Sequence, residues 1–315
     1  MFAVYLRKVS LAMNRIVHKL FFNFCWGIAW RKLSSNEAPL PLNEVKAEYK
    51  HIPISYRHYY ADPFLIYHAD SYYLFAEHML RSRGIGTIAV CQFDGKGFGK
   101  WRDVIVEDFH MSYPNVYSFE NTIYMLPETV AAKKLILYRA TSFPYQWEID
   151  TVLLDNVELV DTSILPEENG KSVLLFSHDV SNGQKALRVY RLDLRNKTIN
   201  EVDLSLINAA DDRPGGNPIH ISNEVFRPLQ DCRRRYGERL LFYRVKNNGE
   251  LLYDEEYVGT VEAKNTKLDH KVHIDCVHTL SRCNDLELID YRYQRFYWNK
   301  PFLRVYQKMK SVLSM

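Results

Sequence analysis

The 315-residue sequence lacks paired cysteines, a marked excess of either charge and any phosphate-binding glycine loop. Its five cysteines are odd in number and show neither a C-x-x-C pair nor a Cys/His metal spacing, so we expect free thiols, a reducing compartment and no bound metal. Lys plus Arg number 41 against 38 Asp plus Glu, and this near balance does not argue for a nucleic-acid partner. The run Gly84-Ile85-Gly86 is too short for a phosphate loop, and we expect no cofactor.

Long apolar runs are also missing. No stretch approaches the roughly 18 apolar residues that span a bilayer, and the longest, from Leu20 to Trp30, is interrupted by Asn23 and Gly27. The N-terminus shows no small-residue cleavage site after an apolar core, which speaks against a secretory signal. These absences together predict a cytoplasmic protein.

The N-terminal residues carry a basic amphipathic pattern. Apolar residues recur at spacings of three and four from Phe2 to Phe24, which predicts a helix. The basic residues off that stripe are Arg7, Lys8, Arg15 and Lys19. Such a helix can lie on an anionic membrane surface, which predicts peripheral contact with the inner face of the membrane through residues 1–24. Docking of the helix on the rest of the chain or on a partner protein is the alternative, and the pattern does not decide between them.

The rest of the chain repeats a strand, a short polar turn and a second strand. The clear copies cover residues 60–78, 112–128 and 159–178, and weaker copies cover residues 216–228 and 276–290. Asp62 to Tyr113 is 51 positions and Tyr113 to Asp161 is 48. A recurrence of that length predicts propeller blades, because one small sheet buries neither face alone whereas a ring of sheets buries both. The predicted fold is all-β, a five-bladed β-propeller with short helical N- and C-terminal extensions.

The predicted organisation has four parts. They are a basic amphipathic segment at 1–33, a connector and first strand at 34–58, the propeller at 59–292 and a basic C-terminal tail at 293–315.

Three carboxylates are the predicted catalytic residues. Asp62 opens the first inner strand, Asp161 lies in the matching region of the third copy, and Glu128 ends the second strand of its copy. Inner strands of a propeller face its axis, so these groups would converge there. Glycosyl transfer or hydrolysis needs one carboxylate to stabilise or attack an oxocarbenium-like centre and a second group to move a proton. The structural alternatives are a turn cap before Pro63 and solvated strand ends.

Six further residues are predicted to bind substrate. They are Glu77 and His178, which end the second strands of their copies, Arg227, Gln230 and Asp231 in the fourth copy, and His278 on the last inner strand. A guanidinium offers a planar fork of donors for carboxylates, phosphates or sugar hydroxyls, which favours Arg227. A lone strand histidine such as His278 is more often structural than catalytic. The run Arg233 to Arg235 is interpreted as a solvated basic turn.

The order of these motifs resembles one protein family. The motifs are Ala61-Asp62-Pro63-Phe64, Tyr73-Leu74-Phe75-Ala76-Glu77, Tyr124-Met125-Leu126-Pro127-Glu128-Thr129, Val160-Asp161-Thr162, Phe226-Arg227-Pro228-Leu229-Gln230-Asp231-Cys232 and Val277-His278-Thr279-Leu280. From Trp26 to Asp290 the chain resembles the propeller domain of plant glucosamine inositolphosphorylceramide transferases, which is also encoded in bacterial surface-polysaccharide gene sets.

That family is similar in turn to the five-bladed propellers of arabinanase, invertase and levansucrase type. The resemblance implies a central carbohydrate site with an acidic residue on the first inner strand. Asp62 would then be nucleophile or base, with Glu128 and Asp161 as candidates for proton donor and transition-state stabiliser. The motifs that carry the acid and the stabiliser in those enzymes are not reproduced in this chain, so only Asp62 maps directly.

Three functions follow as hypotheses. The first is a glycosyltransferase of surface-glycan biosynthesis that takes a sugar donor and a glycan or lipid-linked acceptor. The second is a glycoside hydrolase using the same carboxylates, and the third is a non-catalytic carbohydrate-binding or scaffold propeller.

Overall fold

The structure is a computed structural model that describes residues 17, 20–43, 45–55, 57–80, 84–167, 170–183, 185–246, 252–298, 300 and 302. The chain divides into two units, residues 26–291 and a smaller one made of residues 1–25 and 292–315. Most of the predicted N-terminal helix and the helix predicted in the C-terminal tail lie outside the described residues. Within the described part of the chain, no helix has the length and apolar character needed to cross a membrane.

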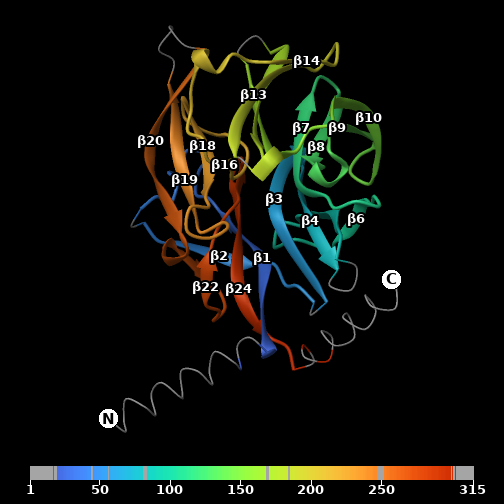
Figure 1. Ribbon diagram of the computed structural model, residues 1–315. Helices are drawn as coiled ribbons and strands as arrows, with labels where there is room; N and C mark the ends of the chain where they lie inside the picture. Colours follow the sequence, from blue (N-terminus) through green and yellow to red (C-terminus); the bar gives the residue numbers. More distant parts are fainter. Residues whose placement is uncertain are drawn as a thin grey trace. The chain divides into compact units, whose positions relative to one another are not determined.

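Residues 26–291 form five sheets of mostly antiparallel strands arranged around a common axis (Figure 1). The predicted all-β, five-bladed propeller is confirmed. Blade one comprises β3 (His58–His68), β4 (Ser71–Leu80), β5 (Gly86–Gln92) and β6 (Arg102–Ile105). Blade two comprises β7 (Ser112–Phe119), β8 (Thr122–Glu128), β9 (Lys134–Ser142) and β10 (Gln146–Asp155). Blade three comprises β11 (Leu159–Pro166), β12 (Ser172–Asp179), β13 (Ala186–Asp193) and β14 (Thr198–Glu201).

The two remaining blades have less regular inner strands. Blade four comprises β15 (Ile207–Asn208), β16 (Arg213–Pro214), β17 (Ile219–Ile221), β18 (Glu224–Asp231), β19 (Arg239–Lys246) and β20 (Tyr253–Glu262). Blade five comprises β1 (Phe22–Lys32), β2 (Ala47–His51), β21 (Thr266–Leu268), β22 (Ile274–Cys276), β23 (Leu280–Cys283) and β24 (Leu286–Phe296). In these two blades the pairs β15–β20 and β2–β21 are parallel. Short 3-10 turns are η1 (Val130–Ala132), η2 (Ser181–Gly183), η3 (Leu204–Leu206) and η4 (Ala263–Asn265).

The fifth blade closes the ring with strands from both ends of the sequence. Its strand order is β21-β2-β1-β24-β22, so β1 and β2 are inserted between strands that come more than 200 residues later. The predicted boundary at residue 59 is therefore wrong, because β1 and β2 already belong to the propeller. The helix predicted to reach Phe24 ends earlier, since strand β1 begins at Phe22.

Alternating side chains on the strands fill the spaces between blades. On β4, Phe75 packs with Tyr113 and Met125 of blade two, whereas the neighbouring Leu74 packs with Ile28 of blade five. This is the period of two that a strand imposes, with successive side chains on opposite faces of the sheet. Both faces of blade one are therefore buried, which explains why its strands are apolar at consecutive positions.

Candidate functional site

A bulge at the start of the inner strands directs side chains toward the axis. Asp62, Tyr113 and Asp161 have φ values of 51°, 47° and 48°, and the pairing register shifts at each of them. A non-glycine residue in this left-handed region costs about 1 kcal/mol or more, and bulges commonly re-aim a side chain next to a functional site. In blade four the corresponding Gly216 has φ of 133°, and a Cβ there would overlap the carbonyl oxygen of Leu280.

Carboxylates at the axis connect one blade to the next. Asp290 accepts a hydrogen bond from the Asp62 N–H at 3.0 Å, and Asp62 accepts one from the Tyr113 N–H at 3.2 Å. Glu128 accepts one from the Asp161 N–H at 3.2 Å. Each acid thus satisfies a backbone donor freed by the bulge of the following blade, which gives these residues a structural task whatever else they do.

Glu128 and Asp161 form a pair held by Arg213. The Arg213 guanidinium donates to Asp161 Oδ2 and, at 3.0 Å, to Glu128 Oε2, while Gln230 Nε2 donates to Asp161 Oδ2 at 2.7 Å. Burial and then the charge of Asp161 raise the pKa of Glu128 well above its usual value. Burial also disfavours ionised Asp161, but Arg213 outweighs it and lowers the pKa of Asp161. The two shifts therefore favour the protonated form of Glu128 and the ionised form of Asp161.

Asp62 lies in a second acidic group of the cluster, with Asp290 and His278. Thr279 Oγ1 donates to Asp62 Oδ1 at 3.0 Å, and His278 Nε2 lies 3.7 Å from the same oxygen. Burial raises the pKa of Asp62 to about 6, reinforced by Asp161 and Asp290 and opposed by His278. His278 Nδ1 lies 2.6 Å from Asp290 Oδ2, and although burial lowers the pKa of His278, Asp290 raises it above the usual value.

Glu77 is a further buried acid of the cluster. Burial, and then the charges of Asp62 and Glu128, raise its pKa well above the usual value. His110 Nε2 lies 3.6 Å from Glu77 Oε1, and the Gly86 N–H donates to His110 Nδ1 at 2.9 Å. Because Nδ1 accepts that bond, neutral His110 carries its proton on Nε2, which faces Glu77.

Next to the acids, neutral polar side chains form hydrogen bonds with one another across the centre of the ring. Asn115 of blade two and Asn217 of blade four exchange hydrogen bonds of 2.6 and 2.7 Å across the ring. The Tyr113 hydroxyl accepts from the Gly216 N–H at 2.7 Å and lies 3.0 Å from Ser163 Oγ. The bonds between Asn115 and Asn217 and between Tyr113 and Gly216 join inner strands 102 and 103 residues apart and hold the acidic residues in a fixed frame.

Aromatic rings border the acidic groups. Trp26 stacks on His278 with ring centroids 3.9 Å apart, and Tyr236 meets His278 edge-on at 5.3 Å. The Arg213 guanidinium lies 5.4 Å from the centroid of Tyr236. Tyr236 is 46% exposed, so it presents an aromatic surface to solvent beside a buried acidic cluster. Such a ring suits the apolar face of a ligand whose polar edge meets the acids.

The structure brings six of the nine predicted site residues into this cluster. They are Asp62, Glu77, Glu128, Asp161, Gln230 and His278. Their roles in catalysis and binding stay predictions.

Three predicted site residues lie elsewhere. Arg227 is fully buried, and its guanidinium binds Glu255 with two hydrogen bonds of 2.7 and 2.8 Å. The predicted grip of Arg227 on a substrate is therefore wrong, because its charge is satisfied inside blade four. Asp231 accepts from Arg233 and Arg239, each at 2.9 Å, and His178 Nε2 lies 2.9 Å from Asp211. None of these contacts connects Asp231 or His178 to the acidic cluster.

Sequence reasoning missed several members of the cluster. Asp290 was identifiable, because it ends the second strand of the fifth copy as Glu128 ends that of the second. Arg213 occupies no repeated position, and its only local signal is that it precedes Pro214 and the glycines of the fourth inner strand. Trp26 and Tyr236 lie outside the repeat units, so only the folded ring reveals their place.

Two groups of His and acidic residues in the described part of the chain have spacings compatible with a metal ion. One is the axial group of Asp62, His278 and Asp290. It fits poorly, because the ring of His278 is already bonded to Asp290, which raises the pKa of His278 and so favours its protonated form, whereas a metal ligand must be deprotonated. The other, His51 with Asp269 and His270, lies at the outer edge of blade five.

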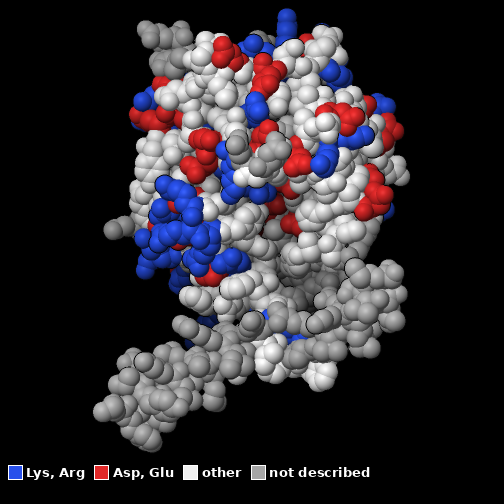
Figure 2. Space-filling model, viewed as in Figure 1, with Lys and Arg blue, Asp and Glu red and all other residues white. Residues whose placement is uncertain are grey.

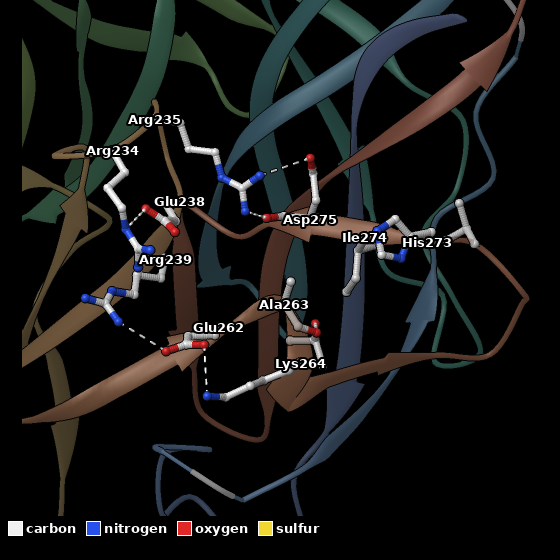
Figure 3. Close-up of a pocket in the computed structure, with 12 residues that line it drawn as sticks. Arg234, Arg235, Glu238, Arg239, Glu262, Ala263, Lys264, His273, Ile274 and Asp275 are labelled. Carbon is white, nitrogen blue, oxygen red and sulfur yellow. Dashed lines mark hydrogen bonds and ion pairs between the residues drawn. The ribbon is translucent and has the colours of Figure 1, made fainter. Parts of the chain in front are cut away.

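Basic side chains gather over β19 and β22, at the left of Figure 2. They border a cavity of about 620 Å³ whose lining includes Arg234, Arg235, Arg239 and Lys264. Each of these cations faces a carboxylate: Glu238, Asp275 or Glu262 (Figure 3). The side chains of Arg233 and Arg234 are 66% and 75% exposed, which agrees with the predicted solvated turn.

The fold and its axial cluster define a class, the five-bladed propellers with an acidic centre. Similar structures are an α-L-arabinofuranosidase of Podospora anserina in complex with cellotriose, at TM-score 0.51 and 10% identity over 84% of this chain and 97% of that one, and a family 117 glycoside hydrolase of Zobellia galactanivorans, at TM-score 0.51 and 10% identity over 87% and 91%. At such identities the likeness shows the fold alone.

Sequence comparison gives the family. Residues 47–282 match the family described as glucosamine inositolphosphorylceramide transferase 1, N-terminal, and the chain belongs to that family. Glucosamine inositolphosphorylceramide transferase 1 of Oryza sativa subsp. indica is 33% identical over 220 residues, 65% of this chain and 29% of that protein. The Arabidopsis thaliana protein of the same name is 30% identical over 211 residues, 62% and 26%. The chain thus spans less than a third of these relatives.

Proposed function

We propose that the axial cluster binds a sugar and that the chain is a glycosyltransferase of surface-glycan biosynthesis. The observation that carries this proposal is the contact of Glu128 and Asp161 with one guanidinium, that of Arg213, in an environment that raises the pKa of Glu128 and lowers that of Asp161, beside Asp62, whose pKa is raised to about 6. Environments that push the pKa values of neighbouring acids apart separate the roles of proton donor and anion. The names of the family's relatives support a sugar as the substrate.

The chemistry assigns one task to each acid. Ionised Asp62 takes the proton of the acceptor hydroxyl while the oxygen of that hydroxyl attacks the anomeric carbon of the donor sugar. The bond from that carbon to the leaving group breaks, and Glu128 donates a hydrogen bond or its proton to the departing oxygen. The Asp161 carboxylate stabilises the positive charge that develops on the sugar. The partners in this scheme are a sugar donor and a glycan or lipid-linked acceptor.

A non-catalytic carbohydrate-binding module is the second candidate. The observation in its favour is that Asp62 and Glu128 already accept backbone hydrogen bonds from the next blade. Carboxylates that already accept backbone hydrogen bonds can still bind and orient a sugar ring through their remaining acceptor sites, without transferring protons. Hydrolysis of a glycan by the same acids is a third outcome of the test below.

Turnover with a panel of nucleotide sugars and glycan or lipid-linked acceptors tests the proposal on the purified full chain. We expect transfer in the wild type, and a loss of about 10²-fold or more in Glu128→Gln, because the amide cannot supply the proton. Glu120→Gln, on the exposed turn of the same blade, is the matched control and should keep wild-type rates. Sugar binding without turnover for any donor would contradict the transferase proposal and favour the binding module, whereas sugar release without a donor would favour hydrolysis.

We further propose that the protein works at the cytoplasmic face of a membrane, with residues 1–24 as the contact. Its support is the basic amphipathic pattern, which falls mainly on residues that the structure does not describe. Replacing Arg7, Lys8, Arg15 and Lys19 by glutamine leaves β1 intact, and we expect this variant to stop floating with anionic liposomes, since each basic residue near such a surface contributes about 1 kcal/mol. Unchanged flotation would contradict the membrane contact.

A further inference from the structure

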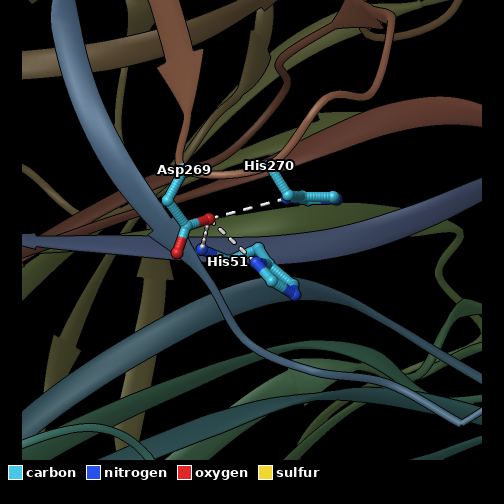
Figure 4. A group of neighbouring side chains, drawn as sticks. All are labelled: His51, Asp269 and His270. Carbon is cyan, nitrogen blue, oxygen red and sulfur yellow. Dashed lines mark hydrogen bonds and ion pairs between the residues drawn. The ribbon is translucent and has the colours of Figure 1, made fainter.

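Two histidines and an aspartate meet where the ring is closed (Figure 4). His51 is the last residue of β2, and Asp269 and His270 directly follow β21, which pairs with β2 in parallel. The pairing continues into the group, because the Asp269 N–H donates to the Tyr49 carbonyl and the His51 N–H donates to Asp269 Oδ1, both at 3.0 Å. These backbone contacts hold Asp269 beside His51, although the two residues come from distant parts of the sequence.

The donor atoms of these residues point to a common place. Asp269 Oδ1 lies 2.8 Å from His51 Nδ1 and 3.5 Å from His270 Nδ1, and one donor atom from each of the three residues lies within 4.8 Å of the others. The imidazole rings are 3.8 Å apart between centroids. His270 Nδ1 is buried from solvent without a hydrogen bond to satisfy it. A buried ring nitrogen without a hydrogen-bond partner is unfavourable, and a cation bound between this nitrogen and the neighbouring carboxylate would give it a partner.

We propose that His51, Asp269 and His270 bind a divalent transition-metal ion of the zinc class. Imidazole nitrogen with one carboxylate is a donor set that zinc accepts, at bond lengths of about 2.0 to 2.2 Å, which separates tetrahedral ligand atoms by about 3.3 Å. The distances from Asp269 Oδ1 to His51 Nδ1, 2.8 Å, and to His270 Nδ1, 3.5 Å, lie on either side of that value. The Nδ1 proton of His51 leaves when the metal binds, because a ligating nitrogen must be unprotonated. Water occupies the remaining position, since the three side chains are 31% to 44% exposed.

The ion would tie the two ends of the propeller together. His51 belongs to the N-terminal strands of blade five, whereas Asp269 and His270 come from the C-terminal part of the sequence. A metal that binds the closed ring and not the unfolded chain stabilises the closed form by mass action. The site is therefore a clamp on ring closure, separate from the acidic cluster at the axis.

Calorimetric titration of the full-length, chelator-treated protein with Zn²⁺ tests this site. We expect one equivalent to bind and to raise the melting temperature. His270→Ala should weaken the affinity roughly tenfold to a hundredfold, the cost of losing one charge-assisted contact, and should remove the thermal shift. His220→Ala, at an exposed histidine of blade four, is the matched control and should bind like the wild type. Equal affinity in His270→Ala and the wild type would overturn the proposal, as would equal weakening in the control.

Cobalt provides a second readout that does not depend on stability. Co²⁺ placed among two imidazoles, a carboxylate and water should give visible absorption that is absent in Asp269→Asn and His270→Ala and retained in His220→Ala. Mg²⁺ should neither bind nor compete, because it prefers oxygen ligands in octahedral geometry. A cobalt spectrum that is the same in all variants would assign the metal to scattered surface groups and overturn the site.

Discussion

Asp62→Asn is expected to lose about 10² to 10⁴-fold in transfer rate while making the protein more stable at pH 7. The rate falls because the amide cannot take the proton of the acceptor hydroxyl. The Tyr113 N–H and the Thr279 hydroxyl donate to different oxygens of Asp62, Oδ2 and Oδ1. The single amide oxygen of an asparagine can keep the bond from the Tyr113 N–H, and its NH2 group can donate to Thr279 Oγ1 instead of accepting from it, so the contacts between blades are kept. Loss of activity would therefore not reflect loss of the fold.

The gain in stability follows from the raised pKa of Asp62. Burial raises this pKa from 3.8 to about 6, so the folded protein holds the proton more tightly than the unfolded chain does. The favourable contribution of protonated Asp62 is complete below pH 4 and is lost as the pH rises through 6, which leaves a penalty of up to about 3 kcal/mol at pH 7. A neutral amide avoids that penalty. In the wild type, activity should fall below pH 6 as Asp62 becomes protonated.

Asp161→Asn is the matched comparison, because the pKa of Asp161 is shifted the other way. Arg213 lowers that pKa below its usual value despite burial, so ionised Asp161 stabilises the fold at pH 7. Urea unfolding at pH 7 should therefore show Asp62→Asn more stable than the wild type and Asp161→Asn less stable. A destabilised Asp62→Asn with unchanged turnover would mean that Asp62 only connects the blades.

The repeat made the ring predictable. Strand period and turn residues are local properties, and three clear copies about 50 residues apart were enough to fix the blades and to place Asp62, Glu128 and Asp161 near one axis. The contacts that decide their chemistry are not local. Arg213 reaches Glu128 across 85 positions and Asp161 across 52, and no spacing rule connects such residues.

Two errors in the sequence interpretation have the same origin. Arg227 alternates with apolar Phe226 as an exposed strand residue would, but Glu255, 28 positions later, pairs with it inside the blade. The apolar spacing that predicts a helix continues from Phe2 to Phe24. The chain nevertheless becomes a strand at Phe22, because β1 lies between β24 and β2 in the sheet of blade five. Both outcomes depend on which distant segment packs alongside, and tertiary packing overrides a short-range pattern of this kind.

Arg213→Met should destabilise the protein by about 3 to 5 kcal/mol at pH 7, because it leaves the buried carboxylate of Asp161 without its cation. The side chain of Arg213 is 22% exposed, while those of Glu128 and Asp161 are 7% and 2% exposed, so solvent cannot replace the lost charge. Arg188→Met is the matched control. Arg188 also pairs with two acids, Asp179 and Glu201, but its side chain is 41% exposed and its removal should cost less than about 1 kcal/mol.

The pH dependence separates the loss of charge in Arg213→Met from the loss of packing. The low pKa of Asp161 contributes stability that is present above the unfolded value near 3.8 and disappears as the pH falls below it. Without Arg213, burial acts on Asp161 against the smaller effects of the hydrogen bond with Glu128 and the charge of His278, so we expect its pKa to rise and the variant to lose stability as the pH rises. Unfolding of both proteins in urea from pH 3.5 to 8 should therefore show a gap that is small in acid and widens toward neutrality. A difference in the free energy of unfolding that stays constant with pH would contradict this prediction. It would mean that Arg213 stabilises the ring through packing and that the ionisation of Asp161 does not depend on Arg213.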